Sequence, residues 1–483
     1  MGARTGAEYL DRLRQRPTEI WLGNERIEDV TTHPALRGCA QSMAHLYDMQ
    51  HDPALRDDMT YTSPTSGDPV GLSFITPRTR EDLQRRSKMM FHWSRFSGGM
   101  LGRSSDYINV EIMAAASAAE FYNQNDSRFG ENAKRYYEYA RENDLCMTHT
   151  LVNPQSNRAL TASGHPSADI ALRIVDENAE GMVVRGARIL ATLGPLADEI
   201  MVFPSTVLKA ASDTNTFAFA FTIPCDTPGM KLICREALSY SGSRVDHPLG
   251  SRFEEMDTIV VFDDVLVPWD RVFLKSDPNL CTRHFPETGC LAHMAQQVAI
   301  KNVCKSEFVL GIACSVAEAL GSTEFQHVQE KIAECMVNLE LMKACLRAAE
   351  ADAEVDKWGV MSPDRAPLDA ARNIFPKMYP RMIEILQLLS ASSLMMIPPD
   401  SALDSPIAED IDRYLVSAGR DARGRLKLFR LAWDVACSAF AGRQVLYERF
   451  FFGDPVRMMS VLYHTYDKQP LMDQVSAFLD RED

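Results

Sequence analysis

The sequence lacks the patterns of a disulfide framework, a metal centre or a secreted chain. Its eleven cysteines are scattered along the chain and include no CxxC pair, and no HExxH motif occurs. Several cysteines lie in helical, apolar stretches, where a free thiol behaves as a small hydrophobic side chain. We therefore expect free thiols in a reducing compartment and no metal. The N-terminus has no apolar signal core, so we expect a cytoplasmic protein.

Membranes and nucleic acids are also excluded as partners. No run approaches the roughly 18 to 20 apolar residues that span a bilayer, and the net charge of -15 repels phosphate backbones. Nucleotide signatures are missing too, because there is no GxGxxG after a strand, no Walker A loop and no GxSxG. If the protein performs redox chemistry, its electrons must arrive on a carrier that was loaded elsewhere.

Three regions of the chain differ in their hydrophobic period. Residues 1–147 show helical patterns, residues 148–276 change to a period of two, and residues 277–483 return to long helices. In residues 216–224, phenylalanine and isoleucine alternate with alanine and threonine, which predicts a half-buried strand. Short strands punctuated by glycine and proline favour an antiparallel barrel or sandwich. The C-terminal stripes predict a four-helix bundle.

Two short stretches combine groups that ordinary packing does not require. In GRSSDYIN, Arg103 and Tyr107 flank the start of a predicted helix, and the plain interpretation is a helix N-cap beside a solvated arginine. In THTLVNPQSNR, His149 lies between two threonines where the helical region meets the β region. Its plain interpretation is a satisfied core histidine.

The order of helical, β and bundle regions is that of the acyl-CoA dehydrogenase-like flavoproteins. Over essentially its whole length the sequence resembles the oxygenase component of the two-component, reduced-flavin-dependent 4-hydroxyphenylacetate 3-monooxygenases and related phenol hydroxylases. GRSSDY is similar to the family's Arg-x-x-Asp-Tyr substrate motif, and THTLVNPQSNR to its histidine and flavin segment. RFEEMDTIVVFDDVLVPWDRVFL resembles the exit from the family's β domain, and RFFFGDPVR its C-terminal flavin contact.

The resemblance implies an α+β protein with an N-terminal α-helical domain, a middle antiparallel β-barrel domain and a C-terminal four-helix bundle, matching the three regions. It implies an aromatic monooxygenase that uses FADH2 and O2. Through a C4a-hydroperoxyflavin, such an enzyme hydroxylates a para-substituted phenol beside its hydroxyl group and forms a catechol.

Arg103, Tyr107 and His149 become the catalytic and phenol-binding residues under this resemblance. A permanent cation beside a phenol lowers its pKa from about 10 and makes the ring richer in electrons. With an ordinary pKa of about 6.5, His149 would exchange the phenol proton near neutral pH. Thr148 and Thr150 would orient its ring.

The family's FAD contacts carry over to polar residues of the β region and to one C-terminal turn: Gln155, Ser156, Asn157, Arg158, Thr161, Ser163, Thr192, Phe452, Gly453, Asp454 and Pro455. The plain interpretation of the last four is a helix C-cap glycine followed by a turn. The tail of the substrate would meet Ser205 and Thr206. Ser105 stands where the family commonly has proline, which would loosen the turn and leaves the identity of the phenol open.

The resemblance further implies a separate NAD(P)H:flavin reductase as partner and a homotetramer. The alternative is a flavin-dependent dehydratase or dehydrogenase of the same superfamily. An iron–sulfur dehydratase needs clustered cysteines, which the stretch around GRSSDY does not contain. An acyl-CoA dehydrogenase needs a glutamate base and a CoA channel, and a helical scaffold would have no use for these two stretches.

Overall fold

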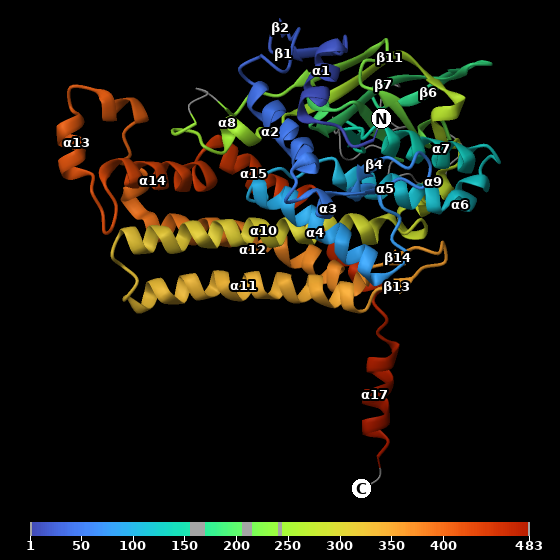
Figure 1. Ribbon diagram of the computed structural model, residues 1–483. Helices are drawn as coiled ribbons and strands as arrows, with labels where there is room; N and C mark the ends of the chain where they lie inside the picture. Colours follow the sequence, from blue (N-terminus) through green and yellow to red (C-terminus); the bar gives the residue numbers. More distant parts are fainter. Residues whose placement is uncertain (1, 155–169, 205–214, 240–243, 482–483) are drawn as a thin grey trace.

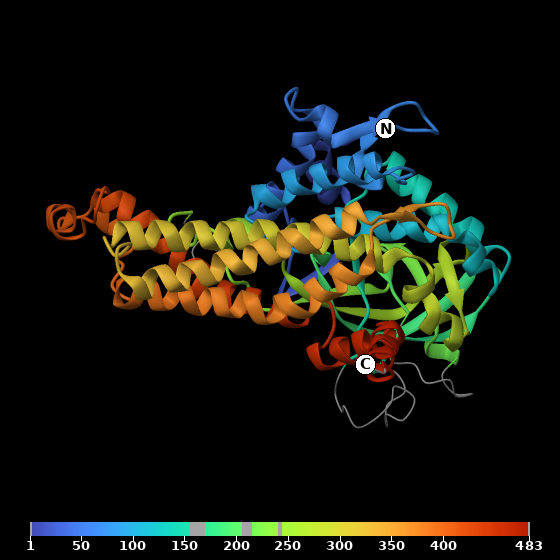
Figure 2. The same cartoon turned by 90° about the horizontal axis from the view of Figure 1, so that it is seen from below.

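The computed structural model describes residues 2–154, 170–204, 215–239 and 244–481. Long C-terminal helices lie side by side beneath the N-terminal helices, and the strands gather at one end of the molecule (Figure 1). Seen from below, the long helices form an extended slab beside the strands (Figure 2).

The N-terminal region is mainly helical, as its sequence predicts. Its helices are α1 (Gly6–Gln15), α2 (Arg37–Asp48), α3 (Arg56–Met59), α4 (Arg80–Phe96), α5 (Asp106–Ser117), α6 (Ala119–Asn123) and α7 (Phe129–Glu142). Capping boxes begin α1 at Thr5 and α4 at Thr79 and fix where these helices start. All residues of α5 from Asp106 to Ala116 are buried, so the segment entering α5 lies in the protein interior.

The strands form two main sheets. The six-stranded sheet has the order β2-β1-β10-β11-β7-β6, and the four-stranded sheet the order β12-β9-β8-β5. Their bounds are β1 (Glu19–Leu22), β2 (Glu25–Arg26), β5 (Met147–Thr150), β6 (Arg173–Glu177), β7 (Gly181–Thr192), β8 (Glu199–Val202), β9 (Phe219–Pro224), β10 (Met230–Cys234), β11 (Asp257–Pro268) and β12 (Val272–Lys275). The β1–β10 and β5–β8 pairs are parallel and the others antiparallel.

The β region departs from the sequence expectation in three ways. Strands β1 and β2 come from the N-terminal region, where only helical patterns were expected. The sequence did not predict them because they are too short to show a hydrophobic period. The described strands form two open sheets that do not close into a barrel. The two sheets meet at Phe221 in β9 and Phe262 in β11, whose ring centroids lie 6.3 Å apart. Strand β9 is buried on both faces instead of one. On its second face, Thr222 lies beside Tyr136 of the N-terminal helix α7.

The C-terminal region is a bundle of long helices, as predicted. Its elements are α9 (Pro278–Glu287), α10 (Cys290–Ala319), α11 (Gln326–Ala351), α12 (Arg365–Ser390), α13 (Ala408–Tyr414), α14 (Ala422–Ala436), α15 (Ala439–Phe450), α16 (Pro455–Thr465) and α17 (Gln469–Leu479). Helix α10 is central and mostly buried, as its apolar surface indicates. Helix α17 projects from the body of the protein (Figure 1), and none of its residues is buried.

Candidate functional site

Arg103 is a buried cation held between aromatic rings. Its side chain is 5% exposed, so the interpretation as a solvated surface charge is wrong. Its guanidinium carbon lies 4.1 Å from the ring centroid of Tyr107, 5.3 Å from that of Tyr447 and 4.8 Å from that of Phe451. Nη1 donates a hydrogen bond to the Tyr447 hydroxyl at 2.7 Å. Among the described residues no carboxylate lies within ion-pair distance of the guanidinium, so its charge is available to an anionic ligand.

His149 joins this group from a different part of the chain. It lies on β5, and its ring centroid is 5.5 Å from that of Tyr107 and 5.2 Å from that of Phe203. Its Nδ1 atom is buried and has no hydrogen-bond partner among the described residues. An imidazole nitrogen without a partner is the exception inside a protein, so a ligand or water is expected at this atom. Arg103, Tyr107 and His149 therefore converge as the sequence predicts.

The pKa of His149 corrects its expected role. Burial and then the charge of Arg103 lower the pKa of His149 well below its ordinary value. The lowered pKa keeps the imidazole neutral at pH 7, so it can form hydrogen bonds without carrying a charge. The sequence instead predicted a group that titrates near neutrality.

The two threonines beside His149 do not orient its ring. Side chains alternate along a strand, so Thr148 and Thr150 project to the face opposite His149. Thr148 instead donates a hydrogen bond from its hydroxyl to the carbonyl oxygen of Thr192 at 2.5 Å. The histidine ring is confined by the rings of Tyr107 and Phe203.

Ser105 connects the stretch that carries Arg103 and Tyr107 to the stretch that carries His149. Its side chain is fully buried, and its hydroxyl lies 2.9 Å from the carbonyl oxygen of Leu145 and accepts a hydrogen bond from the backbone nitrogen of Met147 at 3.2 Å. Met147 begins the strand that carries His149. The hydroxyl therefore ties the start of α5 to β5. That serine loosens this turn relative to proline stays a prediction.

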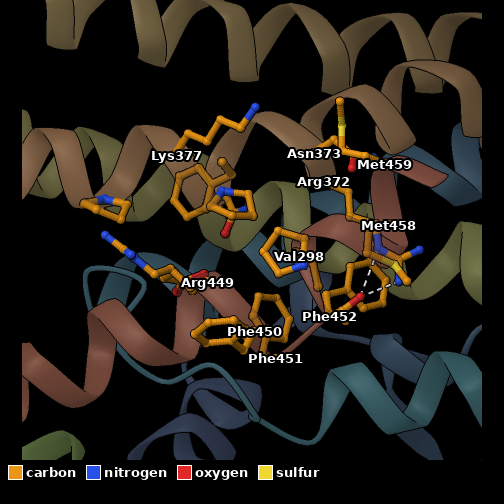
Figure 3. Close-up of a pocket in the computed structure, with 17 residues that line it drawn as sticks. Val298, Arg372, Asn373, Lys377, Arg449, Phe450, Phe451, Phe452, Met458 and Met459 are labelled. Atoms are coloured by element: carbon orange, nitrogen blue, oxygen red, sulfur yellow. Dashed lines mark hydrogen bonds between the residues drawn. The ribbon is translucent and has the colours of Figure 1, made fainter. Parts of the chain in front are cut away.

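A cavity of about 290 Å³ lies beside the C-terminal turn and is bordered by α10, α12, α15 and α16 (Figure 3). Phe451, Phe452, Gly453 and Pro455 contribute to its wall. Figure 3 shows Arg372 reaching from α12 to the carbonyl oxygen of Phe452, to which it donates from Nε at 3.1 Å and also from Nη2. Phe451 also contacts Arg103, so this one ring borders both the cavity and the aromatic cluster around Arg103.

The remaining predicted contacts have separate positions. Asp454 caps α16 by accepting a hydrogen bond from the backbone of Arg457, so its side chain already has a structural task. Thr192 donates to Asp257 at 2.7 Å at the end of β7. Eight residues of the prediction lie outside the described residues: Gln155, Ser156, Asn157, Arg158, Thr161, Ser163, Ser205 and Thr206.

Sequence reasoning missed four residues of this site, namely Tyr447, Phe451, Phe203 and Arg372. Tyr447 and Phe451 lie one helical turn apart, and their parallel rings stack with centroids 4.5 Å apart. On a helix this spacing is the ordinary sign of core packing, so no signal in the sequence separated these rings from the rest of the bundle. Phe203 and Arg372 show no local pattern either.

Comparisons with known proteins show which family this chain resembles. Family models for the N-terminal and C-terminal parts of 4-hydroxyphenylacetate 3-hydroxylase match residues 5–274 and 281–480. The chain is 48% identical over 480 residues to the 4-hydroxyphenylacetate 3-monooxygenase oxygenase component of Geobacillus sp. (strain PA-9), covering 99% of this chain and 97% of that protein. A crystal structure of such an oxygenase component, complexed with FAD and 4-hydroxyphenylacetate, has a TM-score of 0.95 at 47% identity and covers 99% of this chain and 98% of that chain.

A more distant structure shares the fold alone. The 4-hydroxybutyryl-CoA dehydratase from N. maritimus is 18% identical, with a TM-score of 0.88, and the match covers 99% of this chain and 96% of that chain. None of the helices in the described part of the chain combines the length and apolar character that a bilayer span requires.

Proposed function

The chain belongs to the 4-hydroxyphenylacetate 3-hydroxylase family, and on this premise we propose that it is the oxygenase component of a two-component flavin monooxygenase. It hydroxylates a para-substituted phenol beside its hydroxyl group, using FADH2 and O2, and releases a catechol. The observation that supports this function is the buried guanidinium of Arg103, which has no described carboxylate partner and stacks on the ring of Tyr107. The ring of His149, whose Nδ1 is unpaired among the described residues, lies 5.5 Å from that same tyrosine ring.

Each of the three residues has a chemical task toward the phenol. Arg103 stabilises the phenolate and so raises the electron density at the ring carbon that is attacked. Neutral His149 hydrogen-bonds the phenol oxygen through Nδ1. The guanidinium of Arg103 stacks on the ring face of Tyr107, and this ring limits where the phenol can lie. Tyr447 holds the guanidinium from the other side, and is a positioning residue that acts through Arg103.

The residues around the cavity fit a flavin. The cavity offers aromatic walls at Phe451 and Phe452, a cation at Arg372, and two buried amide oxygens, those of Asn302 and Asn373, that lack a partner among the described residues. Amide groups and rings suit an isoalloxazine, and a guanidinium suits its phosphates. A volume of about 290 Å³ is small for a ligand pocket, so it would hold part of FAD. When bound, the reduced flavin supplies the activated oxygen.

Residues outside the described ranges complete the proposed FAD and substrate contacts. We assign the remaining flavin contacts to Gln155, Ser156, Asn157, Arg158, Thr161 and Ser163, together with Thr192 and Asp454. The substrate tail is assigned to Ser205 and Thr206. The relatives named above support 4-hydroxyphenylacetate as the first substrate to test.

The proposed partners are a separate NAD(P)H:flavin reductase and further copies of this chain. The oxygenase-component names of the relatives support a reductase. A homotetramer is supported by α17, because an eleven-residue helix with exposed Leu471, Val475 and Phe478 is not stable alone in water. All eleven cysteines are free, which supports a cytoplasmic location.

A test of the function separates the two components. Purified protein with NADH, O2 and 4-hydroxyphenylacetate should form no catechol, and catechol should appear when chemically reduced FAD is added anaerobically before O2. Turnover with NADH alone would contradict the two-component assignment. A panel of phenols scored for catechol yield per FADH2 then identifies the preferred substrate.

A further inference from the structure

A second cluster of reactive side chains lies behind the proposed phenol site. Glu111 of α5, His284 of α9 and Cys290, the first residue of α10, bring one ligand atom each to within 4.8 Å of one another. All three side chains are fully buried. No step of the proposed hydroxylation uses them.

The cluster has unsatisfied atoms of the kind that bind cations. Both carboxylate oxygens of Glu111 and the Nε2 atom of His284 lack a hydrogen-bond partner among the described residues. A buried carboxylate without donors costs several kcal/mol, unless a proton or a cation neutralises it. Nearly all buried polar groups in proteins have a partner. The Glu111 carboxylate has only Nε2 of His284, 3.5 Å from its Oε1, so a further ligand is expected at this cluster.

One ligand separation in the cluster matches that around a tetrahedral ion, and the other two are within 4.8 Å. Zinc bonds of about 2.0 to 2.3 Å to oxygen, nitrogen and sulfur place neighbouring ligand atoms about 3.4 to 3.6 Å apart. The Oε1 atom of Glu111 lies 3.5 Å from Nε2 of His284, which is this separation. We propose that Glu111, His284 and Cys290 form a binding site for one Zn²⁺ ion, with water in the fourth position.

The charges of the proposed site balance. Zinc binding releases the thiol proton of Cys290 to solvent, and the resulting thiolate and the Glu111 carboxylate neutralise the two positive charges. A buried site without net charge avoids the desolvation penalty of an isolated ion. The mixed oxygen, nitrogen and sulfur ligands favour zinc over magnesium or calcium, which prefer oxygen.

Neighbouring groups already hold the ligands in place. The hydroxyl of Tyr122 lies 3.2 Å from Nδ1 of His284, and a histidine that donates from Nδ1 keeps Nε2 free for a metal. The hydroxyl of Thr288 lies 3.1 Å from the sulfur of Cys290. Burial and the Glu111 carboxylate raise the pKa of the Cys290 thiol above its ordinary value, so the site holds a thiol until a metal ion displaces its proton. Cys290 also begins a helix of thirty residues, and the helix N-terminus favours a thiolate once it has formed.

The ion would connect three elements next to the phenol site. Glu111 follows Tyr107 by one turn of α5, and the ring of Phe203 lies between His149 and His284, with centroid distances of 5.2 and 6.0 Å. Zinc would therefore fix α5 to the start of the C-terminal bundle directly behind the substrate residues. The sequence predicts no metal here because its three ligands come from separate segments.

The test uses cobalt as a spectroscopic substitute for zinc. Full-length protein produced in medium with Co²⁺ should contain about one cobalt per chain and show a near-ultraviolet thiolate-to-cobalt charge-transfer band. Cys290→Ser should lose this band. Cys281→Ser, which changes another buried cysteine on α9, should keep it and serves as the matched control.

Two further measurements keep the proposal testable if Cys290→Ser folds poorly. Tyr122→Phe, which keeps the buried ring, should weaken zinc affinity by roughly 10- to 100-fold in a chelator competition. Zinc added to chelator-treated wild-type protein should raise its unfolding temperature, and should not do so in Glu111→Gln. Wild-type protein that takes up no stoichiometric cobalt or zinc, or a charge-transfer band that persists in Cys290→Ser, overturns the site. None of these readouts depends on hydroxylation activity.

Discussion

Replacing Arg103 by glutamine should raise the pKa of a bound phenol by about three units. The guanidinium is 5% exposed, stacks on aromatic rings and has no described carboxylate partner. A unit charge about 4 Å from the phenol oxygen, at an effective dielectric constant of about 20, contributes about 4 kcal/mol. At about 1.36 kcal/mol per unit, this corresponds to a pKa shift of about three.

The assay uses 4-nitrophenol as a reporter, because its anion absorbs visible light. Absorbance of the bound ligand is followed against pH for the wild type and for Arg103→Gln, without flavin or O2. Arg103→Lys keeps the charge but loses the planar stack, and should retain most of the shift. The reasoning is refuted if the bound phenol has the same pKa in the wild type and in Arg103→Gln.

Four smaller predictions follow from neighbouring residues. His149→Ala should release more hydrogen peroxide per FADH2 oxidised, because the phenol loses a fixed hydrogen bond; unchanged coupling would remove His149 from the site. Tyr447→Phe keeps the ring stack but loses the hydrogen bond to the charged guanidinium of Arg103, which is worth about 1.5 to 3 kcal/mol. The KM for the phenol should therefore rise at least tenfold. An unchanged KM would contradict the positioning role of Tyr447. Ser105→Ala should lower the free energy of unfolding by about 1 to 3 kcal/mol in urea titrations. Ser117→Ala, at the other end of α5 and only partly buried, should cost less. Burial raises the pKa of Asp106 to about 6, so its protonation stabilises the native state. Relative to Asp106→Asn, the free energy of unfolding of the wild type should increase by up to about 3 kcal/mol from pH 7 to pH 4. Parallel curves of unfolding free energy against pH would exclude this.

Several features of the site could be predicted because they are local. Arg103 and Tyr107 are four residues apart at the start of α5, so they are close in space, and the guanidinium lies over the ring. The apolar stripe along residues 328–346 predicts the buried face of α11. Five of its six residues are buried and Ile332 is partly buried; the five are Val328, Cys335, Leu339, Met342 and Leu346. These predictions succeed because helical periodicity is a property of one segment.

The hydroxyl of Ser105 shows where such reasoning fails. A serine before a helix is an ordinary N-cap signal, yet this side chain makes no cap and instead bonds to the chain 40 residues later. The prediction that β9 is buried on only one face failed for the same reason. Residues from another region of the chain cover its second face.

The sequence by itself determined the order of helical, β and bundle regions, the helix faces that are buried, and the motif that places Arg103 and Tyr107 together. Only the tertiary structure decided that Arg103 is buried and bonded to Tyr447, 344 residues away. It also decided that His149 is neutral and that Glu111 meets His284 and Cys290. The physical reason is that a hydrophobic period records which face of a segment avoids water, whereas pKa values and ligand sets depend on which other segments cover that face.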